Sequence, residues 1–221
     1  MKNLLAILLF ILFSSNIVAQ QMTLNQWNEE EKTNIRCLPK YGYVEKTAGQ
    51  LQADSEFIQI TLPRFTSKRI ASEHLIDLGF KYLYHDVETA MYRFNQAYLL
   101  DSTNSNIYWG FGAVYMTLQD YPRAKEQYEE GLLHDPVNTR IMTDYGTYFM
   151  TRGMPGSAIQ YLSKSYMIDS TNQNTSFKLA ACYYYKEDCK NAVYFYERCK
   201  SLGGQPLTKE FVDALQTKCK F

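Results

Sequence analysis

Residues 105–138 read SNIYWGFGAVYMTLQDYPRAKEQYEEGLLHDPVN, and the size pattern of this stretch recurs along the chain every 34 residues. One step forward, positions Gly112, Tyr115, Ala124, Tyr128, Gly131 and Asp135 become Gly146, Phe149, Ala158, Leu162, Ser165 and Asp169. A second step gives Ala180, Tyr183, Ala192, Tyr196, Cys199 and Gly203, and one step backward gives Ala90, Phe94, Ala97 and Asp101. Small residues stay small and bulky residues stay bulky. The pattern therefore predicts an array of similar units in which small and bulky side chains pack against each other.

The pattern resembles the tetratricopeptide repeat, whose signature combines small residues, neighbouring aromatics and a final Asp-Pro pair, here Asp135-Pro136. The resemblance covers residues 72–206 and implies an all-α, right-handed superhelical solenoid. Its four helix-turn-helix units would be 72–104, 105–138, 139–172 and 173–206. One helix pair cannot bury its apolar stripe alone, so neighbouring units stack to complete a core. Capping helices are predicted at both ends, within an N-terminal block 20–71 and at 207–221.

Residues 1–19 have the layout of a secretory signal peptide. Basic Lys2 precedes an apolar run from Leu4 to Phe13, and small and polar residues lead to Ala19. The run is short for a membrane anchor, so we expect cleavage after Ala19, with an uncleaved anchor helix as the alternative. The mature protein is therefore expected to be exported, to the periplasm of a Gram-negative bacterium or beyond the cell, without membrane insertion.

The N-terminal block contains two predicted segments. Residues 37–43 read CLPKYGY and suggest an extended stretch with a proline-directed turn. Residues 47–62 carry spaced apolar side chains, begin at a potential cap, Thr47, and end before Pro63, which predicts a helix covering the open face of the first unit. The block also resembles a group of exported bacterial tetratricopeptide proteins with a short Leu-Pro-x-Tyr-Gly leader. That resemblance implies export and no particular chemistry.

Charge and motifs argue against several functional classes. The chain has 23 basic and 23 acidic residues, so neither nucleic acid nor an anionic lipid surface is an expected partner. His74, His85 and His134 fall in separate places without neighbouring cysteines, and no phosphate loop, nucleophile elbow or metal motif occurs. We therefore expect no catalytic residue, no cofactor and no metal.

Four of the five cysteines lie near the C-terminus. Because helix pairs run antiparallel, the start of the second helix of unit four should lie near the far end of the final helix. This places Cys189 near Cys219 and predicts a disulfide between them, which an exported protein permits. Cys199 takes the small position of Gly131 and needs no partner.

The resemblance also implies a binding surface. In this fold the first helices of successive units line a concave groove, and relatives that hold a C-terminal carboxylate carry Lys and Asn there. The chain instead places aromatic, methionine and threonine side chains at these positions: Phe80, Tyr84, Trp109, Met116, Thr143, Met150, Phe177, Tyr184 and Tyr185. Such a surface suits a peptide segment or a helix of another protein. The alternative is that the helix at 47–62, or the leader around Tyr41, folds back and fills the groove.

The sequence thus predicts a non-catalytic protein–protein interaction module or scaffold of the cell envelope. A chaperone-like or assembly factor that holds clients transiently is the first alternative. An accessory subunit of an enzyme is a remote second.

Overall fold

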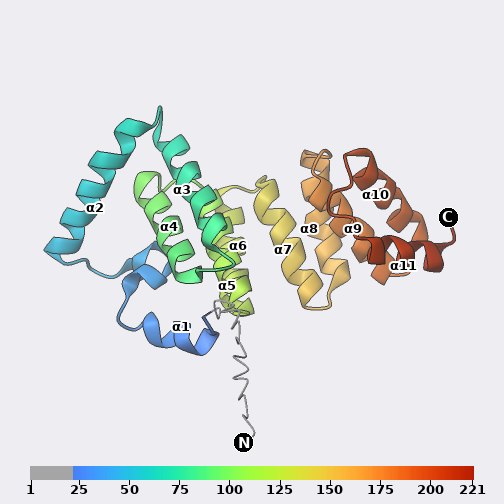
Figure 1. Ribbon diagram of the computed structural model, residues 1–221, viewed down its shortest axis with the longest axis horizontal. Coiled ribbons are helices and arrows are strands. Elements are labelled where there is room, and N and C mark those ends of the chain that lie inside the picture. The colour runs from blue at the N-terminus through green and yellow to red at the C-terminus, as the bar shows by residue number, and fades with distance from the viewer. Residues whose placement is uncertain (1–21) are drawn as a thin grey trace, which may run out of the picture.

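The computed structural model describes residues 22–221, and the predicted signal peptide lies outside this part. Regular structure within 22–221 is entirely helical (Figure 1). The predicted all-α solenoid is confirmed. The α-helices are α1 (Leu24–Glu30), α2 (Ala48–Thr61), α3 (Lys68–Tyr82), α4 (Val87–Leu100), α5 (Asn106–Thr117), α6 (Tyr121–His134), α7 (Thr139–Thr151), α8 (Pro155–Ile168), α9 (Gln173–Tyr185), α10 (Cys189–Ser201) and α11 (Lys209–Cys219), with short 3-10 helices η1 (Ile35–Cys37), η2 (Pro39–Tyr43) and η3 (Leu62–Arg64).

Helices α3 to α10 form four consecutive pairs, and a small residue on the first helix of a pair allows close packing in three of them. A Cβ atom on Gly112 would overlap the ring of Tyr128, which is buried on α6. The same relationship joins Gly79 to Phe94 and Gly146 to Leu162. The repeat pattern of small and bulky residues is therefore a packing pattern, in which the missing side chain on one helix makes room for the ring or branch of the next.

The joints between pairs also repeat. Asp101, Asp135 and Asp169 each follow a second helix, and each carboxylate accepts a hydrogen bond from the backbone N–H two residues later, at 3.0, 3.2 and 2.9 Å. This arrangement is an Asx turn, which requires the aspartate carboxylate as the acceptor and forms with either Ser or Pro as the next residue. Asp101-Ser102 and Asp169-Ser170 therefore make the same joint as Asp135-Pro136.

The leader differs from the predicted extended stretch. Residues 35–43 form the two 3-10 turns η1 and η2, and Lys40, Tyr41 and Gly42 have φ angles of 54, 58 and 66°. Buried Asn95 of α4 holds the leader by donating hydrogen bonds to the carbonyls of Arg36 and Leu38, at 2.8 and 2.9 Å. Tertiary contacts therefore set this conformation.

The predicted N-terminal helix is α2, and it covers less of the first pair than expected. Thr47 caps it together with Gln50 in a reciprocal capping box. No residue of α2 is buried, Leu51 is exposed, and Phe57 and Ile58 are the side chains that pack partly against the core. Figure 1 shows α2 leaning away from α3 and α4 and joining α3 at one end.

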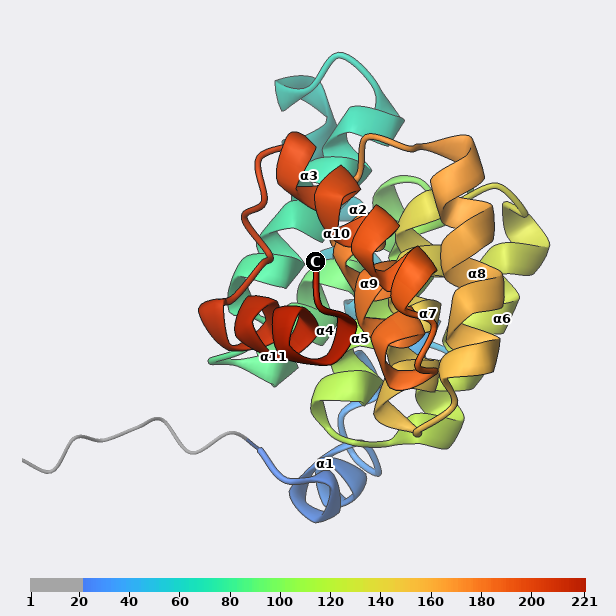
Figure 2. The ribbon, with the colours of Figure 1, turned by 90° about the vertical axis from the view of Figure 1, so that its right-hand side faces the viewer.

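The first pair begins earlier than the predicted unit boundary. Helix α3 starts at Lys68 because the Ser67 side chain caps it, accepting a hydrogen bond from the N–H of Ile70 at 3.1 Å. At the other end of the array, α11 lies at an angle to α9 and α10 (Figure 2) and buries Leu215. Within residues 22–221, no helix combines the length and apolarity needed to cross a bilayer.

Candidate functional site: the concave groove

The first helices of the pairs, α3, α5, α7 and α9, together form a hollow of about 320 Å³. Phe80 and Tyr84 line it from α3 and the turn after it, and Met116 lines it from α5. Asp144 of α7 and Lys178 of α9 complete it from the next two pairs. The hollow therefore spans all four units and depends on their stacking.

Trp109 lies beside this hollow in a fixed orientation. Its ring centroid is 3.9 Å from that of Phe80, and the guanidinium of Arg140 lies 5.3 Å from it. The indole Nε1–H donates a hydrogen bond of 2.6 Å to Asp144. Two neighbouring helices, α3 and α7, thus hold the half-buried indole of α5, and the part of the ring that stays exposed is pre-positioned for an apolar contact.

The charged floor of the groove was not predicted from the sequence. Lys178 Nζ lies 3.1 Å from the Asp144 carboxylate, which also accepts the Trp109 hydrogen bond. The sequence does contain a signal for this ion pair, because Asp144 and Lys178 are opposite charges one repeat apart on consecutive first helices. The pair places both charges in mutual contact, so neither is left to bind an ionic ligand.

A second ionic cluster lies at the start of the first helices. Glu73 accepts hydrogen bonds from Asn104 at 2.8 Å, Asn106 at 2.7 Å and Arg140 at 2.9 Å. Burial would raise the pKa of Glu73, but these hydrogen bonds and the Arg140 charge outweigh it and lower the pKa. With Arg140 paired here and Lys178 paired with Asp144, the groove offers a ligand mainly aromatic and methionine surface.

The structure separates the predicted site residues into four groups. Phe80, Tyr84, Trp109 and Met116 gather around the hollow. Thr143 does not reach the surface: it is buried, and its hydroxyl pairs with those of Ser165 and Thr175 at 2.9 and 2.8 Å. Met150 and Tyr185 line a different hollow of about 240 Å³ at the turn edge of the last two pairs, with Gly153, Pro155 and Cys182.

The last two predicted residues, Phe177 and Tyr184, are covered by the chain itself. Phe211 of α11 lies 5.2 Å from Phe177 and 6.0 Å from Tyr184 between ring centroids. The segments expected for self-filling lie elsewhere, because α2 and the leader pack against α4, a second helix. Self-filling thus occurs at the fourth unit, and α11 provides it.

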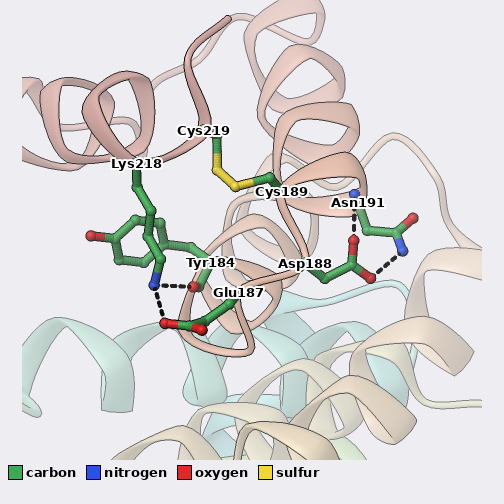
Figure 3. The surroundings of a disulfide bond; sticks show 7 residues. All are labelled: Tyr184, Glu187, Asp188, Cys189, Asn191, Lys218 and Cys219. Atoms are coloured by element: carbon green, nitrogen blue, oxygen red, sulfur yellow. Dashed lines mark hydrogen bonds and ion pairs between the residues drawn. A yellow bond between two sulfur atoms is a disulfide. The ribbon is translucent and has the colours of Figure 1, made fainter.

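A disulfide joins Cys189, the first residue of α10, to Cys219, the last residue of α11 (Figure 3). Lys218 supports the same end of α11 through Glu187 at 3.1 Å and the Tyr184 carbonyl at 3.4 Å. The remaining cysteines are free and buried: Cys37, Cys182 and Cys199.

One group of potential metal ligands lies outside the groove. Glu30, Cys37 and Glu88 bring their ligand atoms within 4.8 Å of one another. Burial raises the pKa of the Cys37 thiol to about 12, so it carries its proton at neutral pH. Asn34 donates to both carboxylates, at 2.8 Å to Glu30 and 3.4 Å to Glu88. These hydrogen bonds account for the cluster, and we assign no metal to it.

Comparison with known proteins finds similarity at the level of the fold. No family model matches the sequence, and no curated protein matches it. The solved structure of MamA AMB-1 is similar over 68% of this chain and 82% of its own, with 18% identity and a TM-score of 0.52. Two further structures resemble this chain less closely in shape. A second MamA structure has 15% identity and a TM-score of 0.49, and the match covers 80% of this chain and 100% of that one. Pseudomonas aeruginosa PilF has 18% identity and a TM-score of 0.36, and the match covers 68% of this chain and 90% of that one. The recurring 34-residue pattern, the four stacked helix pairs and the likeness to the MamA AMB-1 structure identify the chain as a protein of the tetratricopeptide repeat fold.

Proposed function

We propose that the protein is a non-catalytic interaction module whose concave groove binds a segment of a partner protein. The observation that carries this proposal is the partly exposed ring of Trp109, held by Phe80 and Asp144 beside a hollow with a mainly apolar lining. Tryptophan and tyrosine dominate the energetics of protein interfaces, and rigid placement reduces the entropy lost on binding. Paired charges in the floor, Asp144 with Lys178, leave apolar contact as the main source of affinity.

An amphipathic helix is the kind of segment that fits best, because α11 already occupies the equivalent surface of the last unit. Phe177 and Tyr184, which α11 contacts through Phe211, correspond two repeats earlier to Trp109 and Met116. A partner helix seated in the same way would place an aromatic or large aliphatic side chain between Trp109 and Met116. Helix-in-groove recognition of this kind reads residues spaced three and four apart.

We further propose that the protein works outside the cytoplasm, in the periplasm or as a secreted protein, after removal of the signal peptide 1–19. The Cys189–Cys219 disulfide supports this, because such bonds persist in oxidising compartments. The proposed organisation is a leader and capping helix (20–71), four units (72–206) and a C-terminal capping helix (207–221). The expected partner is a protein, and nucleic acid is not.

Two other functions fit the same fold. A chaperone-like or assembly factor would hold many clients weakly in the groove, and an accessory subunit of an enzyme would bind one enzyme. The number of bound partners distinguishes a chaperone-like factor from a scaffold. The identity of the partner distinguishes an accessory subunit of an enzyme from a scaffold.

Site-specific photocrosslinking tests the proposal. A photoreactive phenylalanine analogue at Thr117, in the hollow, is compared with one at Leu133, which is 82% exposed on α6. A scaffold predicts one or two crosslinked proteins from Thr117 that Leu133 does not give and that Trp109→Ala abolishes. Many weakly crosslinked proteins would indicate the chaperone-like function. Equal crosslinking from both positions, unaffected by Trp109→Ala, would rule the groove out as the binding site.

A further inference from the structure

A second cavity, of about 500 Å³, lies between α2, the leader and α4, away from the concave groove. Its volume falls within the range of small-molecule sites, roughly 300–1,000 Å³. Gln50, Asp54 and Phe57 line it from α2, and Tyr92 and Arg93 line it from α4. We refer to this cavity as the α2–α4 cleft.

The cleft exists because α2 contacts α4 over only part of its length and buries no side chain there. A helix of 14 residues with no buried side chain is marginal in water without a partner. The capping box at Thr47 and an ion pair between Lys46 and Asp54 hold its start, and partial burial of Phe57 holds its second half. Two helical faces therefore confront each other across an open space: Gln50, Ala53, Asp54 and Phe57 on α2, and Thr89, Tyr92, Arg93 and Gln96 on α4.

The lining of the cleft is positively charged. Arg36, Lys46 and Arg93 contribute three cations, and Asp54 contributes one carboxylate, which Lys46 pairs with. Arg36 and Arg93 make no ion pair within residues 22–221. Two guanidinium groups thus line the cleft without a carboxylate partner.

Both guanidinium groups are held in place by neutral neighbours. That of Arg36 lies 4.1 Å from the centroid of the Tyr92 ring, and Arg36 Nε donates to the Asn34 side chain at 3.4 Å. Arg93 Nη1 donates to Gln96 at 2.9 Å, while Arg93 Nε is buried and has no hydrogen-bond partner among the described residues. Stacking and hydrogen bonding fix these groups without satisfying all of their donors. A planar guanidinium with free donors matches a carboxylate.

We propose that the α2–α4 cleft binds an organic carboxylate, with the anionic group at Arg36 and Arg93 and an aromatic or aliphatic part against Phe57 and Tyr92. The ligand is either a free small acid or an acidic side chain of a peptide, since both present the same group. This site is independent of the concave groove, and Trp109→Ala should leave binding at the cleft unchanged.

Ligand-observed NMR on the mature full-length chain tests the proposal with named probes. One arm uses 3-phenylpropionate and its neutral isostere 3-phenylpropanamide, and the other uses the tetrapeptide Phe-Glu-Phe-Glu blocked at both ends. We expect the carboxylate to bind at least about tenfold more tightly than the amide, since hydrogen bonds from a guanidinium to a charged acceptor are stronger than those to a neutral one. Binding of the small acid identifies a small-molecule site, and binding of the peptide without the small acid identifies a site for an acidic segment.

Variants locate the binding. Arg36→Gln with Arg93→Gln should abolish it, and Ala53→Trp should block it by filling the cleft from an exposed helical position. The matched control is Ser55→Trp, which adds the same side chain to an exposed position of α2 outside the lining. Circular dichroism checks that each variant folds. If the arginine variant does not fold, the comparison of Ala53→Trp with Ser55→Trp tests whether the probes bind in the cleft. The proposal is overturned if no probe binds at millimolar concentration, if the small acid and its amide both bind and do so equally, or if Ala53→Trp binds as well as Ser55→Trp.

Discussion

Trp109 of the second helix pair and Asp144 of the third are joined by a hydrogen bond of 2.6 Å from the indole nitrogen to the carboxylate. The same carboxylate pairs with Lys178 of the fourth pair at 3.1 Å. One acidic side chain thus connects three consecutive units across the floor of the groove. The orientation of the main candidate contact residue therefore depends on the stacking of units that follow it in the chain.

Replacing Asp144 should destabilise the array and free the indole. For Asp144→Ala we expect a loss of about 1–2 kcal/mol in the free energy of unfolding, because two charge-assisted hydrogen bonds disappear from a partly exposed site. Asp144→Asn keeps an acceptor for Trp109 and should lose less. Urea denaturation measures both, and the emission maximum of Trp109 should shift in the alanine variant. Equal stability of the two variants would show that the Lys178 charge accounts for the whole effect.

Glycine positions inside and outside the helix interfaces should respond oppositely to alanine. Gly112→Ala places a methyl group in the space of the Tyr128 ring and should cost about 1–3 kcal/mol through overpacking. Gly156 lies on α8 with nothing within 4 Å of an added Cβ, so Gly156→Ala should be neutral or slightly stabilising. Thermal unfolding followed by circular dichroism compares them. A Gly112→Ala protein as stable as the wild type would contradict this packing account.

Glu73 should make the free energy of unfolding depend on pH. Burial opposes ionisation of Glu73, yet hydrogen bonds from Asn106, Asn104 and Arg140 prevail and lower its pKa below the ordinary value of 4.5. A carboxyl with a lower pKa in the folded state contributes stability that is fully present above about pH 4.5 and is lost as the pH falls through the folded pKa. Unfolding free energies measured from pH 7 to pH 3 should therefore fall less steeply for Glu73→Gln. Parallel pH profiles for variant and wild type would refute this role.

Reduction of the Cys189–Cys219 bond should loosen α11 first. The bond closes a loop with a sequence separation of 30, for which chain entropy predicts a contribution of about 3–4 kcal/mol. Leu215 is the buried residue of α11 and Phe211 packs partly against α9, so the helix has a small non-covalent interface that the bond reinforces. Hydrogen exchange should show loss of protection in residues 209–219 after reduction or in Cys189→Ser with Cys219→Ser. Cys199→Ser, at a free buried cysteine, is the control, and unchanged exchange in the reduced protein would contradict the tethering role.

The repeated part of the fold was predictable because its determinants are local and recur. Gly112 and Tyr128, or Asp135 at a joint, act through neighbours within one or two helices, so spacing alone reveals them. The leader was not predictable, because Tyr41 adopts a left-handed conformation and is buried, and the 3-10 helix η2 that contains it packs against α4, which is far away in sequence. The hydrogen bonds from Asn95 that fix this leader join residues almost sixty positions apart.

The candidate site was predictable in position and less so in detail. Helical register places Trp109 and Met116 near the groove, but register could not show that Thr143 finds hydroxyl partners in Ser165 and Thr175 and becomes buried. Nor could it show where α11 would lie, because that depends on the loop before it and on Cys219. The sequence pattern assigns a residue to a helix face, whereas tertiary packing decides whether that face stays open.

The covalent attachment of α11 makes the two ends of the array unequal in their resistance to unfolding. In a linear stack, where each unit is supported only by its neighbours, the two terminal units separate most easily. Here the C-terminal end is pinned covalently through Cys219 to the start of α10, whereas the N-terminal end is held by non-covalent contacts alone, such as the burial of Trp27 and the ion pair between Lys40 and Glu130. Under mechanical load or during degradation the chain should therefore come apart from its N-terminal side, and the fourth unit, with α11 on its groove, should be the last to open.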